Sequence, residues 1–432
     1  MATQAEAVLT GADAQAIIDP ARYVNWDALL DRFDRLRSET PVVKVVNDDI
    51  HDPFWLVTSY DDVMRISKDN KLFLNSPRSV TFSDKNSGAF VKSITGGDPN
   101  LVRSLVALDA PTHPQYRRLT QDWFMPKNIR QMEDEIRALA KVTVERLVDA
   151  GGEADFVPLV SAPYPLHVVM QILGVPEADE QRMLFLTQQM FGGQDEDLNK
   201  SGMADMTPEQ VMQLVVGAVA DFEAYFAKLT EEKRANPTDD VASVIANAKV
   251  DGAHLSDRDM AGYYIILAAA GHDTTSASTA GAMMALARDP EQFARLKADR
   301  DLLPGIVEEA IRWTTPVQHF MRTAAEDTEV GGQKIAKDDW LMISYIAANH
   351  DPAVFSDPRK FDASRSPNRH IAFGAGAHQC LGLHMARMEM KILFNELLDR
   401  IETLELAGEP VRAKSTFVGG LKTLPIRYTL SK

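Results

Sequence analysis

Cysteine is almost absent from this sequence: Cys380 is the only one in 432 residues. A lone cysteine excludes an internal disulfide, a cysteine-rich zinc site and an iron–sulfur cluster bound by this chain alone. Basic residues are fewer than acidic ones: the chain has 46 Lys and Arg and 62 Asp and Glu, which gives a formal net charge of -16. This acidity disfavours nucleic acid and anionic membranes as partners.

The sequence also lacks a secretion signal and, with one exception, long apolar runs. Met1–Pro20 contains neither the basic stretch nor the apolar stretch of a signal peptide. Ala261–Ala287 is apolar for long enough to span a bilayer, but it carries Asp273, which is costly inside a membrane. We therefore predict that this run is a buried central helix, and we expect a cytoplasmic protein without a membrane anchor.

Helical periodicity dominates the rest of the chain. Ser256 has the character of a helix cap and predicts the start of the central helix, which we expect to end near Ala287. Strand patterns occur near residues 40–60, 320–345 and 405–430. Leu72–Ala110 has no clear period, and loops of that length are usually disordered or form functional lids. The other predicted helices are Trp26–Leu36, Tyr60–Lys68, His113–Phe124, Lys127–Asp149, Leu159–Leu173, Glu177–Met190, Thr207–Ala235 (preceded by a loop at Gly192–Asn199), Leu302–Trp313 and Leu381–Ile401.

The surroundings of Cys380 favour a metal ligand over a structural thiol. The cysteine lies in the run Phe-Gly-Ala-Gly-Ala-His-Gln-Cys-Leu-Gly, residues 373–382. A lone thiolate is able to serve as one axial ligand of a haem iron. Gly374 and Gly376 allow a tight turn that brings backbone N–H groups to the sulfur, and Gly382 allows the next helix to approach a flat cofactor. The helix N-terminus is expected to lower the pKa of the thiol. A buried, inert cysteine is the simpler alternative.

This run resembles the haem-binding signature Phe-Gly-x-Gly-x-x-x-Cys-x-Gly of the cytochromes P450 at every specified position. The runs Ala261–Ile265, Ala270–Thr275 and Phe320–Ala324 are similar to those of the soluble bacterial members that hydroxylate α-terpineol, and of relatives that act on alkylbenzenes and similar hydrocarbons. The resemblance implies a mainly α fold with small β-sheets and one domain over residues 1–432. It also implies haem b between the central helix and the cysteine loop, O2 as co-substrate, and a monomer.

The same resemblance assigns roles on the central helix. Ala270 and Gly271 would cover the distal face of the haem, and Gly271 would permit a local widening of the helix. Thr274 would hydrogen-bond the oxygen being activated, and Asp273 would relay protons from solvent into a site kept dry. For the neighbouring Thr275, Ser276 and Ser278, the simpler alternative is a bond back to a helix carbonyl. A buried, unpaired aspartate is harder to explain without a function.

Further residues match the family's haem contacts and its structural core. Phe373 would pack beside the sulfur, next to Gly374. Glu309 and Arg312 share a helix face, and with Arg365 they match a motif that braces the cysteine loop. A surface ion pair is the simpler alternative. The expected partners of the two haem propionates are His113, Arg117, Arg322 and His378, with His370 as a weaker candidate.

The implied function is a monooxygenase that inserts one oxygen atom into a C–H bond of a small terpenoid or alkylaromatic substrate. Electrons would come from a separate ferredoxin and an NAD(P)H-linked reductase, because the chain has neither a dinucleotide-binding unit nor a cluster. The substrate pocket is expected to include Val317, Phe320 and Val418, each of which has a simpler interpretation as core. Leu72–Ala110 would form the lid. Candidate ferredoxin contacts, each also explained as ordinary surface, are Arg118, Lys127, Arg130 and Arg387.

Three alternatives remain at this point. A haem-thiolate sensor would use Cys380 without Asp273 and Thr274. A cysteine hydrolase would pair Cys380 with His378 or His384. A peroxide-driven peroxygenase is the nearest alternative, although peroxygenases of the family replace the acid–alcohol pair that this chain keeps.

Overall fold

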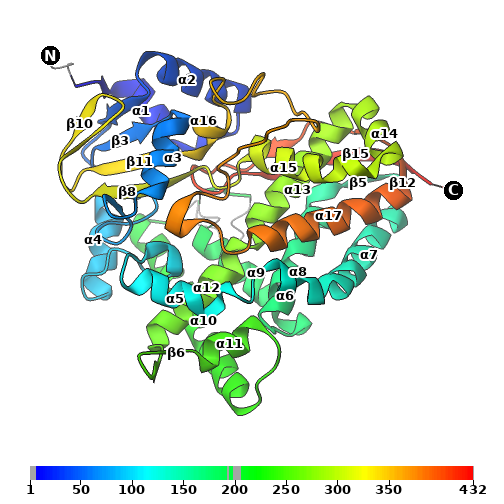
Figure 1. The fold of residues 1–432 in the computed structure, drawn as a ribbon, viewed down its shortest axis with the longest axis horizontal. Helices are drawn as coiled ribbons and strands as arrows, with labels where there is room; N and C mark the ends of the chain where they lie inside the picture. The colour runs from blue at the N-terminus through cyan, green and yellow to red at the C-terminus, as the bar shows by residue number, and fades with distance from the viewer. Residues whose placement is uncertain (1–5, 192–193, 198–205, 432) are drawn as a thin grey trace.

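The fold is a large helical body with a sheet region at one side, as seen in a computed structural model that describes residues 6–191, 194–197 and 206–431. In Figure 1 the sheet lies near the N-terminus, and the C-terminus lies at the opposite end, beyond α17. Half of the loop predicted at Gly192–Asn199 falls outside the described residues. The mainly α class with small β-sheets is confirmed.

The main sheet joins distant parts of the chain. Within the described residues its strand order is β1-β2-β3-β11-β8-β4. Residues 55–57 pair in parallel with residues 341–343, whereas β8 pairs with β11 in the antiparallel sense. All four residues of β3 are buried, in keeping with its sequence Phe-Trp-Leu-Val. The strands of this sheet are β1 Val8–Leu9, β2 Val42–Val45, β3 Phe54–Val57, β4 Phe73–Leu74, β8 His319–Ala324 and β11 Trp340–Ser344.

The remaining strands form small sheets and hairpins. One sheet has the order β12-β15-β5 and uses the C-terminal strand predicted from sequence. Strands β9 and β10, β13 and β14, and β6 and β7 form two-stranded pairs. Their bounds are β5 Glu153–Asp155, β6 Lys249–Val250, β7 Ala253–His254, β9 Thr328–Val330, β10 Gln333–Ile335, β12 Ile401–Leu406, β13 Val411–Arg412, β14 Leu421–Thr423 and β15 Pro425–Leu430.

Most predicted helices are present with small shifts at their ends, but the one predicted at Lys127–Asp149 is divided into α6 and α7 by a 3-10 turn at Arg130–Met132. Side-chain caps explain several starts: Ser59 accepts from Asp62 N–H at the start of α3, and Asn25 accepts from Ala28 N–H at the start of α2. The helices are α1 Gly11–Ile18, α2 Trp26–Glu39, α3 Tyr60–Lys68, α4 Lys85–Ile94, α5 Thr112–Gln121, α6 Pro126–Ile129, α7 Glu133–Asp149, α8 Pro163–Ile172, α9 Glu177–Phe191, α10 Pro208–Ala235, α11 Val241–Asn247, α12 Asp257–Ala270, α13 His272–Arg288, α14 Pro290–Ala298, α15 Leu303–Thr314, α16 Tyr345–Asn349 and α17 Leu383–Arg400.

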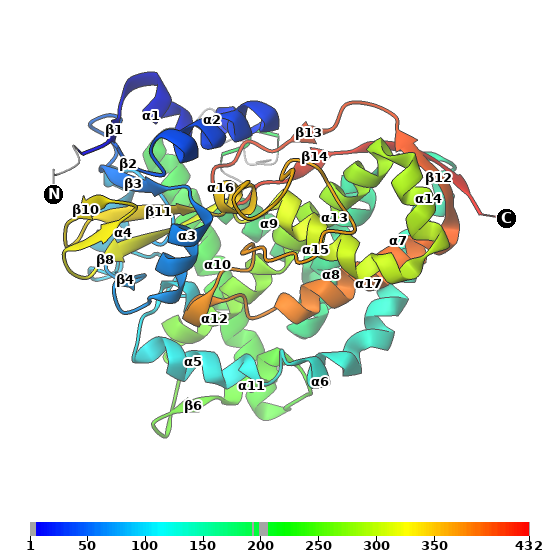
Figure 2. The ribbon, with the colours of Figure 1, turned by 45° about the horizontal axis from the view of Figure 1, so that its top comes forward.

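The central helix differs from the single helix predicted. Its start is as expected, since the Ser256 side chain accepts from Asp259 N–H. Gly271 divides it into α12 and α13, which run through the middle of the molecule (Figure 2). A Cβ added to Gly271 would lie 2.6 Å from a methyl carbon of Val169, so the glycine also allows α8 to pack closely here.

The segment Leu72–Ala110 is more regular than predicted. It contains β4 and also α4, whose first turn is capped by the Asp84 side chain accepting from Ser87 N–H. The helix was missed because Gly88 lies in its middle, and a glycine inside a helix is unfavourable and favours a loop interpretation. The predictions also missed α1, α11, α14 and α16, which are short. Among the described residues, no single helix is long and apolar enough to cross a membrane, although the bent pair Val157–Ile172 and Glu177–Met190 meets the criteria of length and composition.

Candidate active site

The cysteine loop is a tight turn held against the end of α3. Cys380 N–H donates to the Phe373 carbonyl over 2.8 Å. Gly374 and Gly376 have φ of +68° and +75°, which disfavour any side chain. A Cβ on Gly376 would also lie 2.7 Å from the Ser67 carbonyl oxygen. The glycine pattern therefore serves this turn, as predicted.

Cys380 keeps exposed surface as a residue, but its thiol is surrounded by protein atoms. This burial is the largest influence on the thiol and raises its pKa. The Gly382 N–H and the charges of Arg117 and Arg387 act in the opposite direction without cancelling that effect. The expected effect of the helix N-terminus is present, since the Gly382 N–H lowers the pKa of the thiol. Burial outweighs it, because the thiolate loses more by leaving water than it gains from that N–H group.

Phe373 is held by a cluster that the sequence did not reveal. Glu308 of α15 accepts from Arg387 Nε over 2.5 Å and from Arg387 Nη2 over 2.8 Å, and its Oε2 lies 3.1 Å from His370 Nε2. The Arg387 guanidinium lies 4.6 Å from the centre of the Phe373 ring, and the His370 ring lies 5.7 Å from it. His370 therefore pairs with Glu308, contrary to its assignment as a propionate partner. Arg387 binds Glu308 within the protein, contrary to its assignment as a candidate ferredoxin contact. The sequence offered one signal for this cluster, which is that a second carboxylate, Glu308, directly precedes Glu309.

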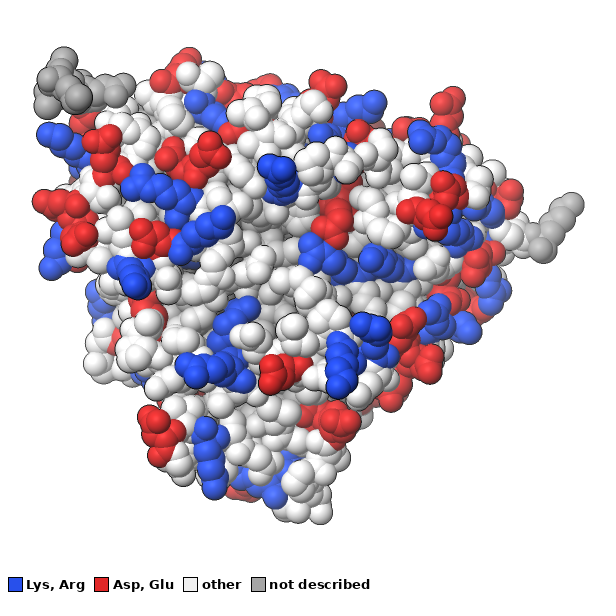
Figure 3. Space-filling view, viewed as in Figure 1, with Lys and Arg blue, Asp and Glu red and all other residues white. Residues whose placement is uncertain are grey.

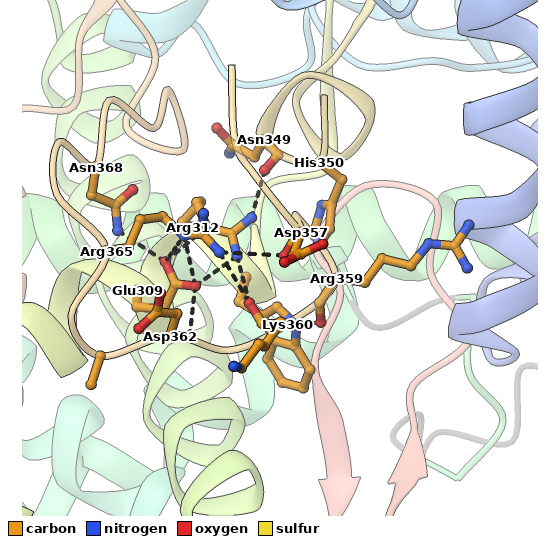
Figure 4. A network of polar contacts seen from close by, with 12 residues as sticks. Glu309, Arg312, Asn349, His350, Asp357, Arg359, Lys360, Asp362, Arg365 and Asn368 are labelled. Atoms are coloured by element: carbon orange, nitrogen blue, oxygen red, sulfur yellow. Dashed lines mark hydrogen bonds and ion pairs between the residues drawn. The ribbon is translucent and has the colours of Figure 1, made fainter. Parts of the chain in front are cut away.

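Glu309, Arg312 and Arg365 come together as predicted. Arg312 donates to both Glu309 oxygens over 2.8 and 2.7 Å, and Arg365 Nε lies 3.1 Å from each of them. Asn368 Nδ2 and Asp362 N–H each add a bond of 3.0 Å. Figure 4 shows these groups converging on the Glu309 carboxylate from the segment that precedes the cysteine loop. Since Glu309 and Arg312 have no exposed side-chain surface, the surface-pair alternative is wrong.

The four expected propionate partners gather in one place. The rings of His113 and His378 lie 4.0 Å apart. Burial, reinforced by the neighbouring positive charges, lowers the pKa of His113 to about 4, with Arg117 contributing and Asp109 opposing. Burial also lowers the pKa of His378 to about 2, helped by His113, Arg322 and Arg117.

These four side chains suit the carboxylates of a haem. His113 Nε2 and both ring nitrogens of His378 are buried and bond to no group among the described residues. Arg322 is buried and uses Nη1 on the Met321 carbonyl, 2.8 Å away. Buried carboxylates need partners of this kind, with N–H donors and positive charge. The cluster therefore fits the propionate edge of a haem.

On the central helix, the acid and the alcohol are both half-buried. Thr274 Oγ1 donates to the Ala270 carbonyl over 2.7 Å, the kind of back-bond that we expected for its neighbours Thr275, Ser276 and Ser278. Ala270 is exposed, although Ala268 and Ala269 are buried. The Asp273 side chain is 39% exposed and lies 3.0 Å from His272 Nδ1.

Glu389 is a second buried acid that the sequence did not single out. Its Oε1 accepts from Thr275 Oγ1 over 3.2 Å and so links α17 to α13. Burial raises the pKa of this carboxyl well above its usual range. The available signal in the sequence was its place among the apolar residues that form the buried face of α17.

The three predicted pocket residues form a partly open apolar group. Val317 and Val418 pair in an isolated β-bridge. Phe320 lies edge-on to Phe417, with ring centres 5.4 Å apart, and to Tyr345, with centres 6.3 Å apart. Val317, Phe320 and Val418 are all only half-buried. They therefore have surface to offer an apolar ligand.

A mainly helical fold with small sheets and one thiol in a glycine-rich turn defines a haem-thiolate enzyme. The chain belongs to the cytochrome P450 family, whose model matches residues 49–430. Cytochrome P450-terp of a Pseudomonas species is 45% identical over 416 residues, 96% of this chain and 97% of the relative. Linalool 8-monooxygenase of Pseudomonas putida is 32% identical, with 92% and 94% covered. The crystal structure of CYP108D1 from Novosphingobium aromaticivorans is 64% identical, with a TM-score of 0.91 over 97% of this chain and 98% of that one.

This chain is accordingly a cytochrome P450 monooxygenase that uses haem and O2. The cysteine hydrolase alternative is thereby set aside. What remains to be assigned is the substrate, the source of electrons and the role of each site residue.

Proposed function

We propose that this enzyme hydroxylates a small branched hydrocarbon of the terpenoid or alkylaromatic class. The observation that carries the proposal is the half-buried apolar group of Val317, Phe320 and Val418. These side chains present an apolar, uncharged surface to a ligand. Linalool, the substrate in the name of one relative, is a branched isoprenoid of that size. The similarity to P450-terp supports the same class.

The haem is proposed to be haem b, with Cys380 as the axial ligand of its iron. His113, Arg117, Arg322 and His378 would bind the propionates. When bound, the haem supplies the activation of O2 and the insertion of one oxygen atom. Phe373, held by Arg387 and Glu308, would shield the sulfur from water, next to Gly374. Ala270 and Gly271 would cover the other face.

Thr274 and Asp273 are proposed to deliver protons to the reacting oxygen. Oxygen activation consumes protons in a site from which substrate excludes water, so a side-chain relay is required. The Thr274 hydroxyl has a bond to the Ala270 carbonyl that it can exchange for one to oxygen by rotation about χ1. Asp273 retains the exposed surface needed to exchange protons with water.

Electrons are proposed to come from a separate ferredoxin and an NAD(P)H-linked reductase. Arg118, Lys127 and Arg130 are exposed on α5, on α6 and just beyond α6. Figure 3 shows blue side chains around the hollowed centre of this face, with red ones mainly at its upper left and along its lower right edge. An acidic ferredoxin would be attracted there despite the net charge of -16. We further propose that residues 1–432 form one P450 domain that acts as a monomer in the cytoplasm.

The first test is the visible spectrum of the purified ferric protein, titrated with a monoterpene alcohol, an alkylbenzene, a biphenyl and a sterol. The proposal expects a shift from low-spin to high-spin with the monoterpene or the alkylbenzene, because a fitting hydrocarbon excludes water from the iron. A response to the sterol alone would overturn the assigned substrate class. Product formation that requires NADH, ferredoxin and reductase, rather than hydrogen peroxide, would separate the monooxygenase from the peroxygenase alternative.

A further inference from the structure

A second cleft lies where α2, the C-terminal part of α13, the end of α15 and the β13–β14 pair meet. Its volume is about 420 Å³, and none of its lining residues belongs to the haem or substrate groups assigned above. Part of the lining is apolar and inside the protein, since Leu30, Met284, Trp313 and Leu421 are buried. The cleft therefore has an apolar base on which the hydrocarbon part of a ligand can pack.

Positive charge exceeds negative charge in this cleft. Its lining includes one acid, Asp27, and three arginines, which are Arg288, Arg359 and Arg412. Arg359 already has a partner, because it donates to Asp31 over 2.7 Å. Within the part of the chain that the structure describes, the Arg288 and Arg412 side chains form no hydrogen bond or ion pair. Two unpaired guanidinium groups thus line the cleft together with one carboxylate, which leaves an excess of one positive charge in a protein of net charge -16.

Arg412 is fixed in place without a counterion in contact. Its guanidinium lies over the Trp26 ring, with the central carbon 4.0 Å from the ring centre. A guanidinium that lies over an aromatic ring keeps the N–H groups at its edge available for an acceptor. Burial lowers the pKa of Arg412 to about 10, the positive charge of Arg288 adds to this effect, and Asp27 opposes it. An anion bound here would supply the missing acceptor and offset the loss of water around the charge.

We propose that this cleft is a binding site for a small organic carboxylate, whose charged end lies between Arg288 and Arg412. A planar guanidinium matches a carboxylate through two parallel N–H bonds. The excess of one positive charge suits a monoanion better than a doubly charged phosphate ester. The apolar base suits an acid with a hydrocarbon body, and a cleft of about 420 Å³ falls within the range of sites for small molecules. The site goes beyond the proposed hydroxylation and does not depend on it.

Binding is measured by isothermal titration calorimetry of the ferric holoenzyme with p-ethylbenzoate at constant ionic strength. We expect saturable binding, and binding about tenfold weaker or more for two comparison compounds. These are p-ethylbenzyl alcohol, which lacks the charge, and inorganic phosphate, which lacks the hydrocarbon body. Equal affinity for the alcohol would overturn the role of the arginines. Equal affinity for phosphate would overturn the organic class of the ligand.

Nuclear magnetic resonance locates the bound carboxylate. The Trp26 Nε1–H has no hydrogen-bond partner among the described residues and belongs to the ring beneath Arg412, so its signal reports on that guanidinium. In protein with 15N-labelled tryptophan, as the diamagnetic ferrous carbon monoxide complex, Trp26→Phe assigns this signal among the five tryptophans. We expect p-ethylbenzoate to shift it saturably and to leave unchanged the signal of Trp340, whose Nε1 donates to the Ser79 carbonyl. An unmoved Trp26 signal would overturn the proposal.

Substitutions test the two arginines separately. Arg288→Gln and Arg412→Gln should each weaken the binding of p-ethylbenzoate about tenfold or more. Arg427→Gln is the matched control, because Arg427 is exposed and paired with Glu153. Wild-type affinity in Arg288→Gln, which changes an exposed residue and keeps the contact of Arg412 with Trp26, would overturn the proposal even where Arg412→Gln fails to fold. Spin-state titrations with hydrocarbons should be alike in all folded variants, so failure of this proposal is distinguishable from failure of the assigned substrate class.

Discussion

Arg312 and Glu309 form a two-point ion pair with no exposed side-chain surface, and the Arg312 Nη1 also donates to the Asn349 carbonyl over 2.8 Å. A buried pair of this kind contributes little net stability compared with apolar residues, but removing one partner leaves a buried charge. The same Glu309 carboxylate binds Arg365 and Asn368, which lie shortly before the cysteine loop. The pair thus connects α15 to the segment that leads to the haem ligand.

Replacing Glu309 should therefore prevent haem incorporation rather than slow the enzyme. Glu309→Ala leaves Arg312 unpaired inside the protein, at a cost of about 3–5 kcal/mol. We expect protein with little or no haem, measured as the ratio of haem absorbance to protein absorbance. Glu153→Ala, which removes an exposed partner of Arg427, is the control and should keep its haem. A haem-replete Glu309→Ala protein of normal stability would contradict the prediction.

Glu308 should make stability depend on pH in the acid range. Although burial raises its pKa, the hydrogen bonds from His370 and Arg387 and their charges lower it from 4.5 to about 2. A carboxyl with a lowered pKa stabilises the fold above its unfolded value and loses that contribution as pH falls through the folded value. We expect Glu308→Gln to be about 1–2 kcal/mol less stable at neutral pH, after allowance for partial solvent screening.

The difference in unfolding free energy between wild type and Glu308→Gln should then shrink as pH falls from 4.5 toward 2. Denaturant unfolding at a series of pH values measures it. Glu153→Gln serves as the control, since the exposed pair with Arg427 is largely screened by solvent. A difference that stays constant down to pH 2 would show that Glu308 is not ionised in the folded protein.

Thr274→Ala should divert electrons to peroxide without preventing substrate binding. The variant loses the hydroxyl next to the reacting oxygen, and proton delivery by a positioned group contributes on the order of 100-fold or more. We expect similar NADH oxidation, product reduced by about 100-fold, and hydrogen peroxide in its place. Ser278→Ala is the control on the same helix, because Ser278 only bonds back to the Thr274 carbonyl. Coupling equal to that of wild type would rule out the role of Thr274.

Phe320→Ala should change which hydrocarbons bind. The ring lies half-buried between Phe417 and Tyr345, so its removal enlarges the proposed pocket. Differences of one methylene in an apolar pocket amount to about 1–3 kcal/mol, and we expect about tenfold weaker binding of the preferred small hydrocarbon, with a relative gain for bulkier ones. Spin-state titrations measure both. Met321→Leu, one residue along β8 and fully buried, should leave the order of affinities unchanged.

Much of the fold was predictable because helices with a clear amphipathic pattern and a capping residue can be recognised from local sequence. The α3 bounds Tyr60–Lys68 agree with the prediction at both ends, since Ser59 caps a helix of strong amphipathic pattern. Short elements were missed, as with α4, whose ten residues include Gly88. At Gly271 we expected a local widening of one helix, whereas the structure divides it into α12 and α13. The contact with Val169 that excludes a side chain at Gly271 comes from another helix and is not specified by local sequence.

The order of residues alone implies a helical class and a glycine turn around Cys380, because these depend on local spacing and backbone freedom. The acid–alcohol pair at Asp273 and Thr274 is implied by the resemblance of the sequence to its family. Which charges meet was decided only when distant segments packed. Glu308 holds His370 and Arg387 against Phe373 across 62 and 79 positions of the chain. The raised pKa of the Cys380 thiol follows likewise from burial by the whole molecule. Hydrogen-bond partners and desolvation are properties of tertiary neighbours, which no local pattern specifies.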